Sequence, residues 1–267
     1  MNKAEQALRE LHEMDALAAG SSPIHALCPL AKFFSTTAYI AVVVSFGKYD
    51  LAGLVPLVLW PVLLFEASGI PVRTCFRKLR FVLPLVLAVG LFNPVFDRAP
   101  YLTLGGLTVS GGTVSMVTLM CKGTFCLMAS FLLMATTRID ALCAALRRLH
   151  VPGAILTLLL LTYRYVGVMT EEVAVMTDAY KLRAPGQRGV HYTAWGSFLG
   201  QLLLRSMDRA EELYASMLLR GFHEHFHYAE AAPCTARDAA YLAASVAAFA
   251  LLRFVNVAAL LGGLMVR

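Results

Sequence analysis

The acidic pair Glu171-Glu172 is the first candidate for chemistry in this sequence, because it follows a long apolar stretch. CAAX-type intramembrane proteases use such a pair together with an arginine four positions further on. Met176 occupies that position here, so a stand-alone intramembrane enzyme is disfavoured. The pattern GxxxxGK[ST] does not occur either, so we expect no ATP binding through a P-loop. We therefore assign no catalytic residue.

A histidine cluster is the second candidate. His223, His225 and His227 occupy alternate positions, so an extended backbone would turn all three imidazoles to one side. Imidazole suits nickel and cobalt, and Glu224 could add a carboxylate. A solvated turn just after a helix end explains the same pattern. We assign no metal site and keep the three histidines as candidates for a transient metal contact.

The third feature is a pair of predicted amphipathic helices, over about 154–183 and 196–220, that each end in an arginine. Pro185-Gly186 stops the first, and Gly221 is the expected C-cap glycine of the second. An arginine in a last turn complements the helix dipole, worth about 0.3–1 kcal/mol. A guanidinium can also form two parallel hydrogen bonds to a carboxylate of a partner. Two such ends in one segment favour docking.

These helices lie between apolar blocks, and the composition indicates a membrane protein. Of the 267 residues, 58% are hydrophobic and 15% are charged. Soluble domains have about a quarter charged residues. The formal net charge of +6 contains no long basic runs, so we expect a lipid bilayer, and no nucleic acid, as partner.

The apolar blocks predict an all-α, polytopic fold with about five transmembrane helices, at about 31–47, 51–67, 81–97, 113–136 and 239–266. The predicted parts are a cytoplasmic N-terminal segment (1–30), helices one to four (31–136), a cytoplasmic coupling-helix region (137–236) and a C-terminal transmembrane helix (237–267). Segments 68–80 and 137–238 hold fifteen Lys and Arg, against two in the short loops 48–50 and 98–112. This asymmetry places the N-terminus and the long segment in the cytoplasm.

Polar side chains inside the predicted spans need partners. Lys122 and Arg253 are costly in a membrane unless they are paired, and Glu66 and Asn256 are candidate partners. An inter-helix contact and a contact with another membrane subunit both remain open. The six cysteines show no CxxC spacing, so we expect all of them to be reduced packing residues.

Several motifs together resemble the T component of energy-coupling-factor (ECF) transporters, in its cobalt/nickel CbiQ-type branch. They cover nearly the whole chain after residue 20. The motifs are Ser22-Pro-Ile-His25-Ala-Leu27-Cys-Pro29-Leu-Ala-Lys32, Leu91-Phe-Asn93-Pro94, Thr136-Thr137, Tyr163-Arg164-Tyr165 with Glu171-Glu172, Leu182-Arg183-Ala184, and the stretch from Gly196 through Arg205 and Arg209 to Leu219-Arg220-Gly221-Phe222. The chain departs from the family at Cys28 and Leu30, and at Ala184 where glycine is frequent.

The resemblance implies a non-catalytic coupling subunit of an ATP-driven importer in the cell (inner) membrane, with cobalt or nickel ions as the expected cargo. Its partners would be two cytoplasmic ABC-type ATPases, which use the ATP, and a separate substrate-binding membrane subunit. The chain itself would bind no cofactor. The implied ATPase-docking residues are Leu182, Arg183, Ala184, Leu219, Arg220 and Gly221. The T component of a vitamin-type importer is the alternative, and a stand-alone enzyme or channel is a distant one.

Overall fold

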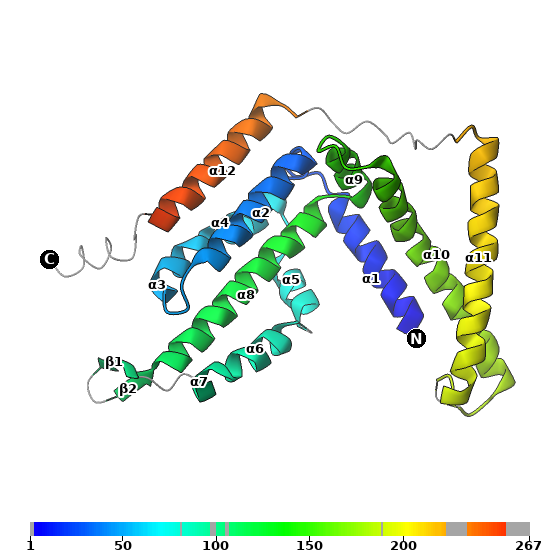
Figure 1. Ribbon diagram of the computed structural model, residues 1–267, viewed down its shortest axis with the longest axis horizontal. Helices are drawn as coiled ribbons and strands as arrows, with labels where there is room; N and C mark the ends of the chain where they lie inside the picture. Colours follow the sequence, from blue (N-terminus) through cyan, green and yellow to red (C-terminus); the bar gives the residue numbers. More distant parts are fainter. Residues whose placement is uncertain are drawn as a thin grey trace. The chain divides into compact units, whose positions relative to one another are not determined.

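The structure is a computed structural model that describes residues 3–80, 82–96, 100–104, 107–187, 189–222 and 234–254 (Figure 1). The chain forms two compact units. The first, here termed the core unit, comprises residues 17–137 and 232–267. The second, the arm unit, comprises residues 1–16 and 138–231.

Helices supply nearly all the regular structure. The core unit contains α2 (Pro29–Ser45), α3 (Leu51–Leu54), the 3-10 helix η1 (Val55–Val58), α4 (Leu59–Ser68), α5 (Val72–Leu79), α6 (Leu83–Leu91), α7 (Asn93–Phe96), the hairpin β1 (Pro100–Leu104) and β2 (Leu107–Ser110), α8 (Gly111–Thr136) and α12 (Ala236–Phe254). The arm unit contains α1 (Lys3–Ala18, whose last two residues belong to the core unit), α9 (Ile139–Arg147), α10 (Gly153–Arg183), the 3-10 helix η2 (Tyr192–Ala194) and α11 (Trp195–Leu219).

The predicted all-helical, polytopic class is confirmed. In the described part of the chain, three helical stretches are long and apolar enough to cross a membrane. They are Leu51–Ser68 (α3 to α4), Gly111–Thr136 (α8) and Gly153–Arg183 (α10), and α2 is a shorter apolar helix. The inclusion of α10 is notable, because its first half was predicted to belong to the cytoplasmic coupling region.

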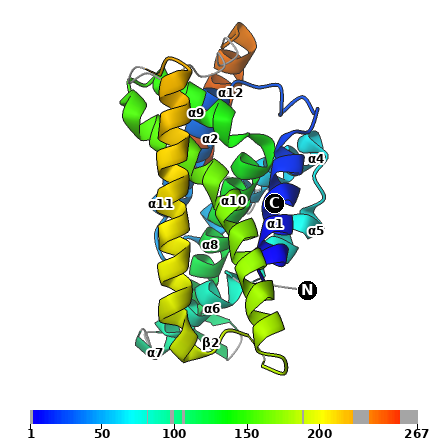
Figure 2. The same ribbon diagram turned by 90° about the vertical axis from the view of Figure 1, so that its right-hand side faces the viewer.

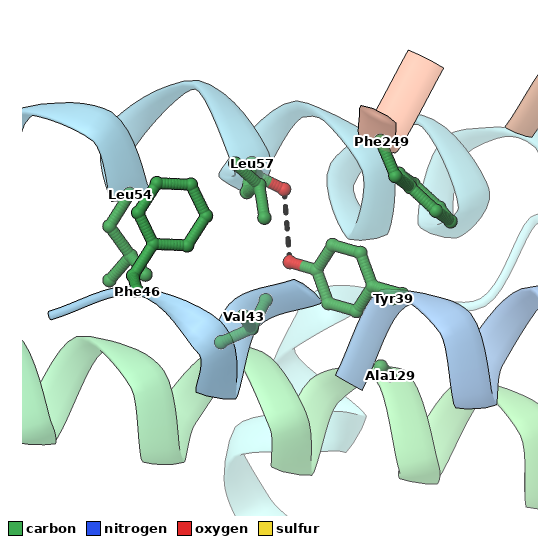
Figure 3. Packing of buried hydrophobic residues seen from close by; sticks show 7 residues of the cluster. All are labelled: Tyr39, Val43, Phe46, Leu54, Leu57, Ala129 and Phe249. Carbon is green, nitrogen blue, oxygen red and sulfur yellow. Dashed lines mark hydrogen bonds between the residues drawn. The ribbon is translucent and has the colours of Figure 1, made fainter. Parts of the chain in front are cut away.

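The core unit is built around α2, which packs against both α8 and α12 (Figure 1). Tyr39 of α2 is fully buried at their meeting point, and its hydroxyl donates a hydrogen bond of 2.9 Å to the Leu57 carbonyl (Figure 3). Its ring stacks on Trp60 with 4.4 Å between centroids and meets the edge of Phe249 at 5.4 Å. Aromatic contacts of this kind each add about 0.5–1.5 kcal/mol beyond area burial. One side chain thus links the first, second and last predicted spans.

The predicted span 81–97 differs from the observed structure. It contains α6, of nine residues, and α7, of four. Nine helical residues rise about 14 Å, less than half the hydrocarbon thickness. Pro94 has no N–H to continue the ladder of α6, which explains the break near Phe92. The predicted loop 98–112 contains an antiparallel hairpin in which Leu104 pairs with Leu107.

Close packing fixes α6 and α7 on α8. A Cβ atom at Gly123 would lie 2.7 Å from a methyl carbon of Val86, so only glycine allows this approach. The Asn93 side-chain amide donates a hydrogen bond of 3.1 Å to the Ser115 hydroxyl. The Leu-Phe-Asn-Pro motif therefore has a structural role in joining α7 to α8.

The expectation of six reduced cysteines is wrong for two of them. Cys28 and Cys234 form a disulfide with their Cα atoms 5.5 Å apart, although they are separated by 206 positions in sequence. The other four cysteines are free. Burial raises the pKa of the Cys75 thiol to about 11 and also raises the pKa of Cys143, so both are poorly reactive at neutral pH.

Candidate functional site

The end of α10 carries the first predicted docking residues. Arg183 is the last residue of the helix, and the Ala184 N–H closes it with a bond of 3.0 Å to the Tyr180 carbonyl. Leu182 is 85% exposed and Arg183 is exposed beside it. Lys181 in the same turn pairs with Asp178 at 2.9 Å. In the described part of the chain, no acidic side chain pairs with Arg183, so its guanidinium is open to a partner.

The end of α11 carries the second set. The Gly221 N–H bonds to the Leu218 carbonyl and the Phe222 N–H to the Met217 carbonyl, both at 3.0 Å, which is a Schellman C-cap. Gly221 has a φ of +80°, a conformation that glycine adopts without strain. The predicted C-cap glycine is therefore confirmed. The cap fixes Arg220 and the 90% exposed Leu219 at a well-defined helix end.

The two arginine-bearing ends lie far apart in the arm unit. Along the chain, α10 leads to a short connection and α11 returns from it, so the two helices are antiparallel (Figures 1 and 2). Arg183 lies at the connection, whereas Arg220 follows the far end of α11. The 25 residues of α11 span about 37 Å at 1.5 Å per residue. The geometry thus provides two separate docking positions, each with an exposed leucine beside an arginine.

An ion pair links the two helices near their midpoints. Arg205 of α11 donates to the Glu172 carboxylate of α10, and Asp208, Arg209 and Glu212 line the same small cavity. In the N-terminal half of α10, the Tyr163 hydroxyl donates a hydrogen bond to the Asp15 carboxylate and so connects α1 to α10. Glu172 therefore has a structural partner in this unit, as one of the two acidic residues singled out in the sequence.

We expect charge reversal at this ion pair to destabilise the arm unit and a charge swap to restore it. Glu172→Arg or Arg205→Glu would place like charges together and should cost about 1 kcal/mol, because the pair is partly solvated. The double variant restores opposite charges. Thermal unfolding of the four proteins measures the coupling. If the double variant melts at the sum of the two single losses, the pair does not hold α10 to α11.

A third feature is the set of points where the chain passes between its two units. The passages lie at 16/17, 137/138 and 231/232. Inside the core unit, residues 22–32 contact Leu17 and Thr136, next to the first two passages, and Asp238 in the first turn of α12. The His25 imidazole Nε2 donates to the Leu17 carbonyl at 3.0 Å, which leaves Nδ1 to accept from Ser22. The first resemblance motif is therefore the anchor of the chain segments that lead to the arm unit.

Lys32 and Cys28 make the other two anchoring contacts. Lys32 is buried, with 5% of the residue exposed. Its ammonium donates a hydrogen bond of 2.7 Å to the Thr136 carbonyl at the end of α8. The Cys28 N–H donates to the Asp238 carboxylate at 2.8 Å. Asp238 also accepts from the Thr235 N–H and hydroxyl, so it caps α12. The role of Asp238 was missed in the sequence, although the Thr-x-x-Asp spacing before an apolar run is a capping signal.

The intramembrane cations have main-chain partners. Lys122 donates to the Val44 and Phe46 carbonyls, and Arg253 donates to the Ser45 carbonyl at 3.3 Å. Both side chains therefore satisfy the carbonyls at the C-terminus of α2. Glu66 is exposed on α4, and Asn256 lies outside the described residues. The inter-helix contact is present, with backbone acceptors in place of the suggested acidic partner.

The histidine cluster at 223–227 also lies outside the described residues. Among the residues that the structure does describe, no group of three His, Cys, Asp or Glu side chains could hold a metal ion.

Comparison with known proteins decides the family. The profile of CbiQ, described as cobalt transport protein, matches residues 20–228. The chain belongs to the CbiQ family. It is thus a membrane protein of this family, and the CbiQ-type resemblance seen in the sequence is confirmed.

Three relatives illustrate the range of the CbiQ likeness. The chain is 37% identical over 93 residues to the cobalt transport protein CbiQ of Rhodobacter capsulatus, covering 34% of this chain and 37% of that protein. It is 32% identical over 91 residues to the nickel permease LarQ of Lactiplantibacillus plantarum, covering 34% and 33%. The energy-coupling factor transporter transmembrane protein BioN of Rhizobium etli is 24% identical over 216 residues, covering 77% and 96%. The cobalt and nickel matches thus span about a third of each relative.

Proposed function

We propose that this CbiQ-family chain is the coupling subunit of an ATP-driven importer. It passes the closure of two cytoplasmic ABC-type ATPases to a separate substrate-binding membrane subunit. The observation that carries the proposal is that two helices end in an exposed Leu-Arg pair, Leu182-Arg183 after α10 and Leu219-Arg220 after α11. The two helices are antiparallel and joined by the Arg205–Glu172 ion pair, so these ends lie at opposite ends of the pair. The chain itself performs no catalysis and binds no cofactor, since the partner ATPases use the ATP.

The placement follows from charge. With the basic segments facing the cytoplasm, the N-terminus and the arm unit would lie on the cytoplasmic side of the inner membrane, where soluble ATPases can reach both arginines. In this placement α10, although long and apolar enough to cross a membrane, lies at the membrane surface. The apolar faces of α10 and α11, including Leu158 at 68% and Leu203 at 61% exposure, are not covered by the residues that the structure describes. The bilayer and the substrate-binding subunit are the partners that would cover them.

The proposed cargo is cobalt or nickel ions, supported by the family profile and by the names of two relatives. Uptake by cells that express the chain with its neighbouring transporter genes tests the cargo. Accumulation of a vitamin, and not of either metal, would instead assign the T component of a vitamin-type importer.

Co-purification tests the coupling role. We expect the tagged chain to retain its ATPases and the double variant Arg183→Glu/Arg220→Glu to lose both. Carboxylates on the ATPases that bind the two arginines would repel the glutamates that replace them. The matched control, Lys181→Glu/Arg209→Glu, changes the net charge equally on the same two helices and should retain them. Equal ATPase recovery from the two double variants would refute docking through the helix ends.

A further inference from the structure

A large pocket in the core unit is unrelated to the helix ends. Its volume is about 1120 Å³, and it lies between α5, α6 and α8. This exceeds the roughly 300–1,000 Å³ of most small-ligand sites. The space therefore suits a larger molecule than a metal ion or a nucleotide fragment.

One wall of the pocket is strongly basic. Arg73, Arg77 and Arg80 all line it, and their spacing of three and four residues places them along one side of α5 and its end. None of the described residues that line the pocket is acidic, and no ion pair engages the three guanidiniums within the described chain. The site therefore offers several adjacent donors for an anionic group with more than one oxygen.

The apolar wall of the pocket comes mainly from α6 and α8, through Leu83, Pro84, Leu87 and Met120, and Phe76 of α5 adds to it. Leu87 is 43% exposed in the isolated chain, so the wall is not covered by other described residues. The basic segment directly precedes the apolar α6, which places the arginines where a membrane surface meets its hydrocarbon interior.

We propose that this pocket binds one anionic phospholipid. The arginines hold the phosphate-bearing headgroup, and the acyl chains lie along the apolar wall formed by α6 and α8. A headgroup with net negative charge satisfies the basic wall, and the acyl chains of the same molecule cover Leu83 and Leu87. Binding here would fix α5 and α6 against α8, and it does not depend on the coupling role of the arm unit.

Lipid titration of the full-length chain in a non-ionic detergent tests the proposal. Native mass spectrometry counts bound lipid, and thermal unfolding follows stabilisation by phosphatidylglycerol, phosphatidylcholine or inorganic phosphate. We expect one phosphatidylglycerol to bind at least tenfold more tightly than phosphatidylcholine. Stabilisation of equal size by inorganic phosphate would identify a free-anion site and overturn the lipid assignment.

Two kinds of variant locate the site. Arg77→Gln should weaken phosphatidylglycerol binding at least tenfold, whereas Lys78→Gln, on the same helix but not lining the pocket, should change it less than twofold. Leu87→Trp keeps every charge and should also reduce binding by filling the apolar wall. Each variant is first compared by melting without lipid. Equal losses in Arg77→Gln and Lys78→Gln, or full binding by Leu87→Trp, would show diffuse charge attraction in place of a pocket.

Discussion

Reversal of one arginine at a time should leave one ATPase bound. Arg183 and Arg220 lie at opposite ends of an antiparallel pair, separated by the length of α11, so each would engage a different ATPase. A buried arginine anchor at an interface is worth about 2–4 kcal/mol, which corresponds to about thirtyfold or more in affinity. Arg183→Glu and Arg220→Glu should therefore each lower the complex from two ATPases to one, and substrate uptake should fall by more than tenfold in each.

Mass measurement of the purified complexes in detergent gives this stoichiometry directly. The single reversals Lys181→Glu and Arg209→Glu serve as controls on the same helices. If either single arginine variant releases both ATPases, the two ends act on one joint surface. Two retained ATPases would show that the tested end makes no essential contact.

Lys32→Met should produce the largest loss of stability. The substitution keeps the side-chain length but removes donors to the Thr136 and His25 carbonyls, at 2.7 and 3.3 Å. It also removes the electrostatic attraction between Lys32 and Asp238. Charged hydrogen bonds contribute about 1.5–3 kcal/mol, and a buried acceptor left unpaired adds a penalty. We expect a loss of about 3 kcal/mol and a melting temperature lower by roughly 6–12 °C.

Thermal unfolding in detergent measures this loss, with Lys48→Met as a control because Lys48 lies exposed in a turn. Comparing Lys32→Met, Asp238→Asn and the double variant separates their coupling from the individual contacts. A melting temperature for Lys32→Met within a degree or two of the control would show that residues 22–32 do not anchor the passages between the units.

Much of the arm unit could be predicted from the sequence, because its features are local. Apolar periodicity and charge marked α10 and α11, and the glycine after Arg220 predicted the observed C-cap. Such signals depend on residues within one or two turns of each other. The exposure of Leu182 and Leu219 was not predictable, since it depends on what the remainder of the chain leaves uncovered.

The sequence by itself determined the membrane class, the family resemblance and the arginine-ended helices, because composition and helix termini are set by nearby residues. Only the tertiary structure paired Cys28 with Cys234, brought Asp238 to the start of α2, and turned Lys122 and Arg253 toward the end of α2. It also placed Arg183 and Arg220 at opposite ends of the antiparallel helix pair α10 and α11, which the Arg205–Glu172 ion pair joins. These contacts join residues far apart in the chain, and only packing of the helices decides which distant groups meet.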